Sequence, residues 1–487
     1  MTGIPVFPSW NTAEMVEGIR RAWDDDHPVL LLNPSMARLG PVADWLASAV
    51  EPGRGRPDGF QALLMTSGTT GEPRLVALDR TSVAWNADTV ADHLDLPTDG
   101  SLLVRLHVPL FHAFGLALAF FAGERCGGRH ALVSRFDPEG LVRWLAGDSA
   151  EAAPGSVPRP VPGPVPGPVP GPGDHLLLPL VPAMIRSLPA ADRLPVGVRR
   201  RLEGLRGTSI TGGDRVTQAD MQALSALLPG MVHTIGYGLT EAGPALTHTS
   251  RADPHIPGVD GLAGRPLPGV ELQPPETGGA AGIDPGEAAG SASASTSAAT
   301  SVTAAGSAAS ASASASATAA SSASRGWLFR SPGQAAALLE RGSPVWRPVR
   351  GTWLPTGDLL ESVPGEDGLL QVVGRASWCF KRKGETVSPV LVEEALARAF
   401  REIHGASLTR TLVLGPEGET LVLQVEGPPD PAIESALDSA SRSLPSFLRP
   451  ERIAWVDRFP RNALGKVVRV SEVPGSRGAR TPQAQAG

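Results

Sequence analysis

The stretch of this sequence best suited to chemistry is rich in glycine and hydroxyl groups. It runs from Met65 to Arg74 and follows the apolar pair Leu63-Leu64, so it opens at the end of an expected strand. Glycine lets such a loop close tightly around an anion, while backbone N–H groups and hydroxyls donate hydrogen bonds to it. The stretch therefore predicts a phosphate-binding loop. It lacks the Gly-x-x-x-x-Gly-Lys-[Ser/Thr] pattern of a Walker A loop, and a polar turn between two strands is the alternative.

Two later segments also combine glycine with acids or hydroxyls near an expected strand. Gly207–Asp214 follows one such strand, and the strand Val232–Ile235 runs into Gly236–Glu241. A glutamate beside a threonine at a buried strand end suits Mg²⁺, which takes one or two carboxylates and completes its shell with phosphate oxygens and water. Thr240 and Glu241 form such a pair. A strand-end turn with a solvated acid is the alternative.

Two histidines lie close to a third expected strand, which starts at Leu102. We expect His107 to be an ordinary hydrogen-bonded core residue. His112 lies beyond the strand end, where ligands of α/β sheets tend to bind, so it remains a candidate functional residue.

The composition is that of a globular chain, with 487 residues, 41% hydrophobic, 19% charged and a formal net charge of −6. This length allows two or more domains. The chain has no long basic tract, so its charge pattern does not indicate nucleic-acid binding.

The two cysteines, Cys126 and Cys379, are far apart in the chain. They form neither a disulfide framework nor a zinc motif, so a reducing compartment, the cytoplasm, is expected. Met1–Trp10 does not look like a signal peptide. Val108–Gly123, the most apolar stretch, is too short for a membrane span and is expected to be a buried helix.

Helices and strands alternate around these segments. Before the glycine loop we expect a helix capped by Thr12 and ending near Trp23, a strand over Pro28–Leu32 and a helix over Val42–Val50. After it we expect the strand Arg74–Leu78, the helix Ser82–Leu94, the strand Leu176–Pro182, a helix from about Ala183, the strand Leu369–Val373 and a turn at Gly374-Arg375. A smaller unit follows, with the helix Leu391–Phe400, the strands Thr411–Leu414 and Thr420–Val425, the helix Ile433–Leu444 and the strand Arg452–Val456.

Two segments of biased composition interrupt the pattern. Residues 154–173 repeat Val-Pro-Gly-Pro and are expected to be an extended surface insert, because proline fixes φ and removes donors. Residues 274–324 turn Gly-rich and then Ala/Ser-rich, bury too little apolar area to offset ordering entropy, and are expected to be disordered. Residues 274–324 split one expected β-rich unit, with Gly269–Leu272 on one side and Gly326–Phe329 on the other. The tail, residues 474–487, is expected to be disordered too.

Taken in order, these segments resemble the adenylate-forming (AMP-binding) superfamily of acyl-CoA synthetases, aryl-acid ligases and peptide-synthetase adenylation domains, over nearly the whole chain. The resemblance implies an α/β fold with a large N-terminal domain over residues 1–374, made of parallel-type sheets with helices and a small β-rich subdomain, and a small mobile α+β C-terminal domain over residues 375–473. It also implies a reaction in two halves. A carboxylate attacks the α-phosphate of ATP to give an acyl-adenylate and pyrophosphate, and the thiol of CoA then displaces AMP.

The resemblance also implies roles for matching residues. Asp358 would hold the ribose with Arg375 as its partner, Glu241 would bind Mg²⁺, and Lys466 would contact the substrate carboxylate and the α-phosphate. The implied ATP-binding residues are Thr66, Ser67, Gly68, Thr69, Thr70, Gly71, Arg74, Gly212, Gly213, Asp214, Tyr237, Gly238, Asp358 and Arg375. The candidate catalytic residues are Lys466, Thr240, Glu241 and His112, and the CoA path would pass Lys383 and Gly384.

The sequence departs from the family pattern at several points. Arg74 and Leu75 stand where lysine and glycine are usual. At the hinge, Ser377 and Trp378 replace two aspartates. The hinge change makes the thioester step the less secure of the two expected half-reactions. The part before the glycine loop is short, as in some o-succinylbenzoate-CoA ligases.

The substrate is expected to be a fatty or aryl acid. Phe111–Phe114 lacks the aspartate that holds the ammonium of an amino acid, and an unpaired buried ammonium is costly. CoA is the expected acceptor. The alternatives are transfer to an acyl carrier protein, no thiolation, or a catalytically inactive nucleotide-binding homologue, which the joint retention of the acidic and basic candidates disfavours.

Overall fold

The structure is a computed structural model. It describes residues 6–7, 11–33, 45, 59–66, 74–148, 168–250, 259–275, 326–341, 343, 345–382, 385–405, 408, 410–417, 420–461, 467 and 469. Most of the expected helix at 42–50, residues 154–167 of the first expected insert, residues 276–324 of the second and the whole tail lie outside this range.

A large sheet carries most of the strand ends noted above. Among the described strands its order is β17-β18-β11-β10-β9-β8-β7-β5-β6. From β6 to β9 the neighbours are parallel, and from β9 to β17 they are antiparallel. The bounds are β5 Leu102–Leu106, β6 Arg129–Leu132, β7 His175–Leu180, β8 Arg206–Thr211, β9 Val232–Gly238, β10 Ala245–His248, β11 Leu262–Pro266, β17 Asp358–Ser362 and β18 Leu370–Arg375. Every residue of β5 is buried, as expected where both faces of a parallel sheet are covered.

A second sheet holds the strands on either side of the glycine loop. Its order among the described strands is β1-β2-β3-β4-β14-β15. The bounds are β1 Val6–Phe7, β2 Val29–Leu31, β3 Phe60–Thr66, β4 Arg74–Asp79, β14 Ala337–Glu340 and β15 Arg347–Pro348. A smaller sheet pairs β12 Glu271–Gln273, β13 Leu328–Arg330 and β16 Leu354–Pro355. Leu272 lies opposite Phe329, so the expected β-rich unit on both sides of the second insert is confirmed.

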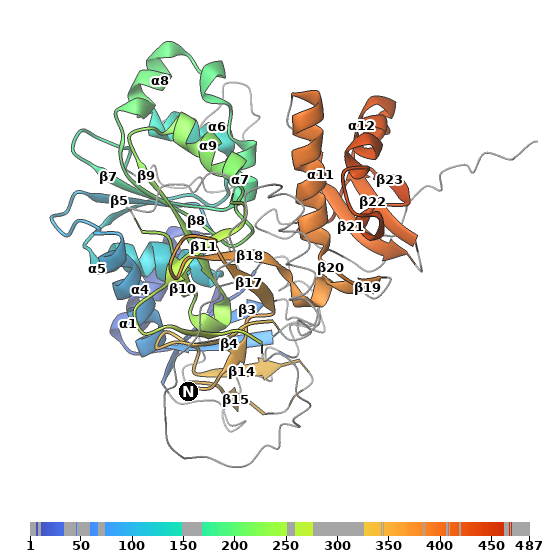
Figure 1. Cartoon of the computed structure of the whole chain (residues 1–487). Helices are drawn as coiled ribbons and strands as arrows, with labels where there is room; N and C mark the ends of the chain where they lie inside the picture. Colours follow the sequence, from blue (N-terminus) through green and yellow to red (C-terminus); the bar gives the residue numbers. More distant parts are fainter. Residues whose placement is uncertain are drawn as a thin grey trace, which may run out of the picture.

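The helices of the large body pack against these sheets (Figure 1). The bounds are α1 Ala13–Asp24, α4 Arg80–His93, α5 Ala122–Arg125, α6 Pro138–Leu145, α7 Pro182–Ser187, α8 Val196–Glu203 and α9 Gln218–Leu227. Short 3-10 turns are η2 Ala191–Arg193, η3 Thr240–Ala242, η4 Ala376–Trp378 and η5 Ser446–Leu448. The cap at Thr12 is confirmed, because its hydroxyl accepts the N–H of Met15 at 3.1 Å. Among the described helices, none is both long and apolar enough to cross a bilayer.

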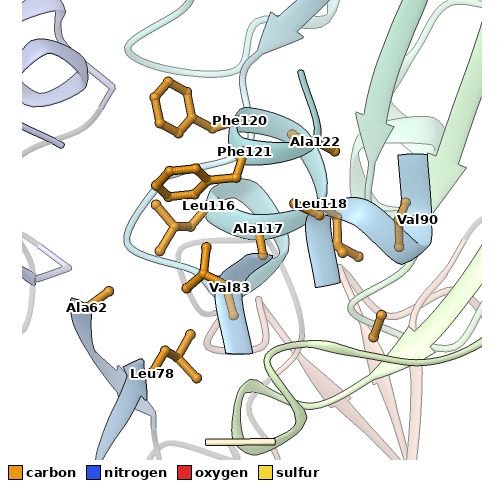
Figure 2. Close-up of a cluster of buried hydrophobic side chains, with 14 of the residues drawn as sticks. Ala62, Leu78, Val83, Val90, Leu116, Ala117, Leu118, Phe120, Phe121 and Ala122 are labelled. Carbon is orange, nitrogen blue, oxygen red and sulfur yellow. The ribbon is translucent and has the colours of Figure 1, made fainter. Parts of the chain in front are cut away.

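A loop that carries His112 is expected between the strand from Leu102 and a helix, and it is confirmed, but the buried helix expected over Val108–Gly123 begins later. The stretch runs as a loop up to Ala113, and only then does the π-helix η1, Phe114–Phe121, begin and lead into α5. A Cβ on Gly115 would lie 2.4 Å from the carbonyl oxygen of Pro109, so only glycine lets the helix start this close to the loop. Figure 2 shows the η1 side chains Leu116 and Ala117 beside Val83 of α4, in the same buried cluster as Leu78 of β4. Each such fully buried large side chain contributes about 1.5–3 kcal/mol.

A smaller unit with its own core follows β18. Its elements are β19 Phe380–Arg382, β20 Glu385–Val387, α11 Pro389–His404, β21 Leu412–Glu417, β22 Thr420–Glu426, α12 Pro431–Ser441 and β23 Arg452–Val456. Val392, Leu396 and Phe400 of α11 pack against the sheet and α12 at helical spacing. In Figure 1 this unit, coloured orange to red, lies beside the larger body.

Three expected boundaries are wrong. The residues from Gly207 to Thr211 belong to β8 itself, and Gly374 and Arg375 end β18 instead of forming a turn. The proline-rich insert is shorter than expected at its C-terminal end. The indole of Trp144 donates to the carbonyl of Pro168 at 2.9 Å and Val169 packs on a core cluster, so residues 168–173 belong to the folded body.

Candidate active site

Three of the predicted segments meet at one edge of the large sheet. Strands β5, β7, β8 and β9 are parallel neighbours, so their carboxyl ends share this edge. His112 lies between β5 and η1, Gly212–Asp214 follow β8, and Thr240 with Glu241 forms η3 after β9. The carboxyl edge of such a sheet is where ligands usually bind.

Gly212 brings the loop after β8 close to β9. Its N–H donates to the carbonyl of Leu180 at 3.1 Å. A Cβ at this position would lie 2.5 Å from the carbonyl oxygen of Gly236, so a larger residue would push the two strand ends apart. Gly213 follows with φ of 77°, and Asp214 accepts the N–H of Arg215 at 2.8 Å. The loop therefore offers backbone and one carboxylate at the sheet edge.

Tyr237 and Asp358, far apart in the chain, are brought together by the sheet. The hydroxyl of Tyr237 donates to Oδ2 of Asp358 at 3.0 Å. Asp358 lies opposite Arg375 in the β17–β18 pair, and Nε of Arg375 is 3.8 Å from Oδ1 of Asp358. Gly238, at the end of β9, pairs with Ala245 of β10. The structure thus gathers a phenol, a carboxylate and a guanidinium that the sequence assigned to one ligand.

The carboxylate of Asp358 is held in a fixed position. Only 8% of the residue is exposed. Its N–H donates to Oγ1 of Thr356 at 3.1 Å, while that hydroxyl donates to the carbonyl of Trp327 at 2.9 Å. Burial, followed by the neighbouring Asp358 charge, raises the pKa of Tyr237 well above its usual value, so its phenol stays a hydrogen-bond donor.

A second polar group links the two sheets. Nη1 of Arg74 lies 3.1 Å from Oε1 of Glu241, and Nε of Arg74 lies 2.8 Å from Oε1 of Glu340. Burial lowers the pKa of Arg74, but its contacts with Glu340 and Glu241 outweigh that effect and leave the pKa above its usual value. Glu241 is thus a carboxylate facing a permanent cation at the sheet edge.

Thr66, at the end of β3, has a buried hydroxyl with no hydrogen-bond partner among the described residues. Thr66 lies directly opposite Arg74 in the β3–β4 pair. An unpaired buried hydroxyl beside a guanidinium fits an anion better than a plain turn, because buried polar groups rarely lack a partner.

The donor set also fits Mg²⁺. The described residues contain no group of three or more histidine, cysteine and acidic side chains that could hold a metal alone. Glu241 offers one carboxylate, with 17% of its side chain exposed. Such a donor suits an ion that takes most of its ligands from phosphate and water.

His112 and His107 are both neutral at physiological pH. Burial lowers the pKa of His112 to about 4 and that of His107 to about 3. The residue His112 is half-buried, yet its Nε2 is enclosed and has no hydrogen-bond partner in the described part of the chain. Its ring is tilted against that of Phe111, with the ring centroids 4.8 Å apart. As a functional group it offers a hydrogen bond, not a positive charge.

Several predicted residues lie outside the described residues. They are Ser67, Gly68, Thr69, Thr70 and Gly71 of the glycine loop, Lys383 and Gly384 of the expected CoA path, and Lys466. The chain beyond Lys466 is attached to the small unit, since Val467 forms a bridge with Arg461 and Nη1 of Arg469 is 2.8 Å from Oε1 of Glu393.

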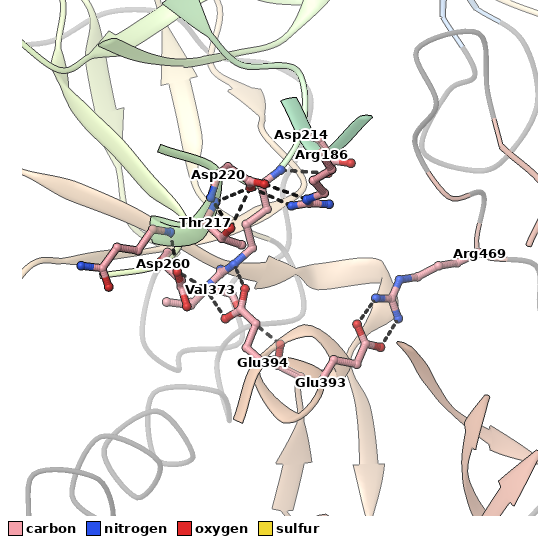
Figure 3. A network of polar contacts seen from close by, with 12 residues as sticks. Arg186, Asp214, Thr217, Asp220, Asp260, Val373, Glu393, Glu394 and Arg469 are labelled. Carbon is pink, nitrogen blue, oxygen red and sulfur yellow. Dashed lines mark hydrogen bonds and ion pairs between the residues drawn. The ribbon is translucent and has the colours of Figure 1, made fainter. Parts of the chain in front are cut away.

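The loop after β8 also contacts the small unit (Figure 3). Arg215 forms a two-pronged ion pair with Glu394 of α11, with Nη2 at 2.6 Å from Oε2. Nη2 also donates to the carbonyl of Asp260 at 3.2 Å. Burial raises the pKa of Glu394, although the charge of Arg215 acts in the opposite direction. Arg186, beside this loop, pairs with Asp220 of α9 at 2.8 Å.

The sequence analysis missed Glu340, Arg215 and Glu394. No motif marks them. Their contacts depend on how β14 lies against β4 and how α11 lies against the loop after β8, and neither arrangement is visible as a local pattern.

The fold is that of adenylate-forming enzymes. The o-succinylbenzoate-CoA synthetase of Bacillus subtilis, solved with its acyl-adenylate intermediate, superimposes with a TM-score of 0.62 over 96% of this chain and 87% of that one, at 18% identity. At this identity the likeness concerns the fold alone.

A family model described as AMP-binding enzyme matches residues 13–152 and 176–279, and the chain belongs to this family. The 4-coumarate-CoA ligase 2 of Narcissus pseudonarcissus is 24% identical over 427 residues, which is 85% of this chain and 62% of that protein. A feruloyl-CoA synthase of an Amycolatopsis species is 24% identical over 417 residues, which is 84% of this chain and 68% of that protein. The chain spans less than two thirds of the length of several plant relatives.

Proposed function

We propose that this chain is an AMP-forming acid-thiol ligase. It activates a fatty or aryl acid with ATP to an acyl-adenylate, releases pyrophosphate and transfers the acyl group to CoA. The observation that carries the proposal is the meeting of Tyr237, Asp358 and Arg375 beside the loops that follow β8 and β9, because this arrangement suits a nucleoside.

The nucleoside end of ATP is assigned to the large sheet. Adenine lies against Gly212, Gly213 and Asp214 and stacks on Tyr237, while Asp358 accepts hydrogen bonds from the ribose hydroxyls. The 8% exposure of Asp358 supports this role, since a fixed and nearly dry carboxylate binds hydroxyls with little reorganisation.

The phosphates are assigned to the junction of the two sheets. The loop from Thr66 to Gly71 wraps the β- and γ-phosphates with Arg74, and Thr240 binds the α-phosphate. The unpaired hydroxyl of Thr66 supports this assignment. Bound at Glu241, Mg²⁺ neutralises phosphate charge, so that a carboxylate can approach.

Lys466 is assigned to the reacting centre, on a small domain of residues 375–473 that moves relative to residues 1–374. Its ammonium holds the substrate carboxylate against the α-phosphate during adenylation. Lys383 and Gly384 line the path of CoA in the second half. The separate core of the small unit supports this division.

The acid is one without an α-amino group. The described stretch around His112 offers no anion for an ammonium, since Phe111 and Phe114 are apolar and the imidazole is neutral. The names of the relatives, 4-coumarate-CoA ligase and feruloyl-CoA synthase, favour hydroxycinnamic acids as the first aryl candidates.

CoA is the proposed acceptor of the acyl group. An acyl carrier protein is the alternative acceptor, and the test below distinguishes the two. The proposed location is the cytoplasm, where ATP and CoA are available.

The test is pyrophosphate release by purified protein with ATP, Mg²⁺ and a panel of fatty, hydroxycinnamic, benzoic and amino acids. Each acid is assayed without acceptor, with CoA and with a phosphopantetheine-bearing carrier protein. We expect acid-dependent release that turns over with CoA. Turnover with the carrier protein but not with CoA would make the carrier protein the acceptor. ATP binding without pyrophosphate release for any of the acids contradicts the proposed ligase activity.

A further inference from the structure

The guanidinium of Arg74 lies between two carboxylates that come from different parts of the chain. Nη1 is 3.1 Å from Glu241 after β9, and Nε is 2.8 Å from Glu340 in β14. The exposed fractions of the side chains are 15% for Arg74, 17% for Glu241 and 46% for Glu340. The contact with Glu241 is therefore the more enclosed of the two.

The two contacts differ in how firmly the fold fixes them. Arg74 and Glu340 lie directly opposite each other in the antiparallel pair β4–β14, next to the buried partners Leu75 and Leu339. This register places the two side chains beside each other on one face of the sheet. Glu241 lies in η3, between two strands of the other sheet, and its carbonyl accepts the N–H of Ala335 at 2.9 Å.

A carboxylate paired with a guanidinium is a weaker metal ligand, because the fixed positive charge repels a second cation and already occupies Oε1 of Glu241. The charge of a guanidinium is spread over three nitrogens, so Arg74 can stay paired with Glu340 through its charge while Nη1 leaves Glu241 for another anion. Phosphate oxygens are the anions that this end meets best, since the pairing is charge-assisted and bidentate.

We propose that Arg74 acts as an exchangeable counter-ion of Glu241. In the nucleotide-free protein it holds the carboxylate, and arriving phosphate draws it away, so that Glu241 becomes available to a divalent cation. Glu340 is the positioning residue that keeps Arg74 in place during this exchange. The inference rests on the proposed function, because it takes the phosphate of ATP as the incoming anion.

The exchange predicts opposite effects on metal and nucleotide. In nucleotide-free protein, Arg74→Met should tighten Mn²⁺ binding, followed by electron paramagnetic resonance, by about tenfold, the usual worth of one charge-assisted hydrogen bond. The same variant should bind metal-free ATP about tenfold more weakly in EDTA. Glu340→Gln should act oppositely on the metal and weaken Mn²⁺ binding about threefold, because Arg74 then directs its whole charge at Glu241.

Two controls make the readings specific. Arg330→Met removes the arginine of another cross-strand pair, with Glu271, and should leave Mn²⁺ binding unchanged. The double variant Arg74→Met with Glu241→Gln should lose the Mn²⁺ affinity that Arg74→Met gained. This loss would show that the gain depends on the carboxylate of Glu241.

The inference would be overturned if Arg74→Met and the unmodified protein bound Mn²⁺ with affinities within twofold of each other. Tighter Mn²⁺ binding by Glu340→Gln would also overturn it. Neither result depends on catalysis. If the unmodified protein releases pyrophosphate while these affinities do not change, the ligase stands and the exchange fails. If Mn²⁺ binding changes as expected but no acid supports release, the ligase fails and the competition between Arg74 and metal stands.

Discussion

The hydroxyl of Tyr237 donates to the carboxylate of Asp358 across 3.0 Å, although 121 residues separate them in the chain. Tyr237 ends a parallel strand and Asp358 begins an antiparallel one at the far side of the same sheet. The contact therefore depends on the complete sheet, and it holds the only tyrosine of the chain beside a negative charge.

This contact makes the tyrosinate absorbance a direct probe of the site. The native state retains the phenol proton above about pH 10, where an unfolded tyrosine loses it. The native state then binds more protons than the unfolded state, so stability must fall as pH rises beyond that value. We expect no tyrosinate signal until the protein unfolds. Tyr237→Phe provides the baseline, and ionisation near pH 10 in folded protein would contradict the contact.

Local sequence patterns predicted the elements whose cause is local. Thr12 and the apolar spacing of α1 define that helix within a few residues, and they were read correctly. The run Phe114–Phe121 has no polar face, so its periodicity could not distinguish an α-helix from the observed π-helix or reveal where it begins. Its start depends on the contact of Gly115 with the loop before it, which is a tertiary feature.

Two buried histidines should make the protein acid-sensitive. Burial lowers the pKa of His107 to about 3 and that of His248 to about 4. The unfolded state binds these protons from about pH 6.5 downward, so their contribution is complete above that value and is lost as pH falls toward 4. Each is worth about 3 kcal/mol, because the range covers about 2.5 pH units at about 1.4 kcal/mol per unit.

Urea unfolding at several pH values measures this effect. His248→Gln should flatten the decline of the free energy of unfolding between about pH 6.5 and 4. His404→Gln, at an exposed position at the end of α11, should leave the decline unchanged. Equal slopes in all three proteins would show that His248 is not the titrating group.

The glycine loop up to Arg74 and the strand-end pair Thr240-Glu241 carry a local signal, whereas Tyr237 and Asp358 were implied by the resemblance to the family. Which of these residues meet is a question of register. The Arg74–Glu340 pair exists because β14, from beyond the second insert, lies against β4, and no short pattern specifies that pairing. A sequence can thus indicate the chemical groups of a site while their partners depend on the fold.

Lys466 offers a test that separates the two proposed half-reactions. Lys466→Ala should slow acid-dependent pyrophosphate release about a hundredfold, the usual cost of removing one donor from a transition state. Thioester formation from a supplied acyl-adenylate should change much less. Arg442→Ala is the control, because it removes an exposed cation of the small unit that has no part in the proposed site. Equal losses in both half-reactions would contradict a role confined to adenylation.

The ion pair of Arg215 and Glu394 should couple the loop after β8 to the small unit. Only 14% and 17% of these side chains are exposed, so removing one partner leaves a poorly solvated charge. We expect Arg215→Glu to destabilise the protein by about 3 kcal/mol in urea unfolding, and the added change Glu394→Arg to restore at least half of that loss. The exposed pair Arg442 and Asp438, at 74% and 61%, should show less than about 0.5 kcal/mol in the same exchange. In adenylation assays the single variant should lose activity and the double variant regain it, because the loop after β8 also carries the proposed adenine contacts. A double variant no better than the single would mean that the contact does not hold the two units together.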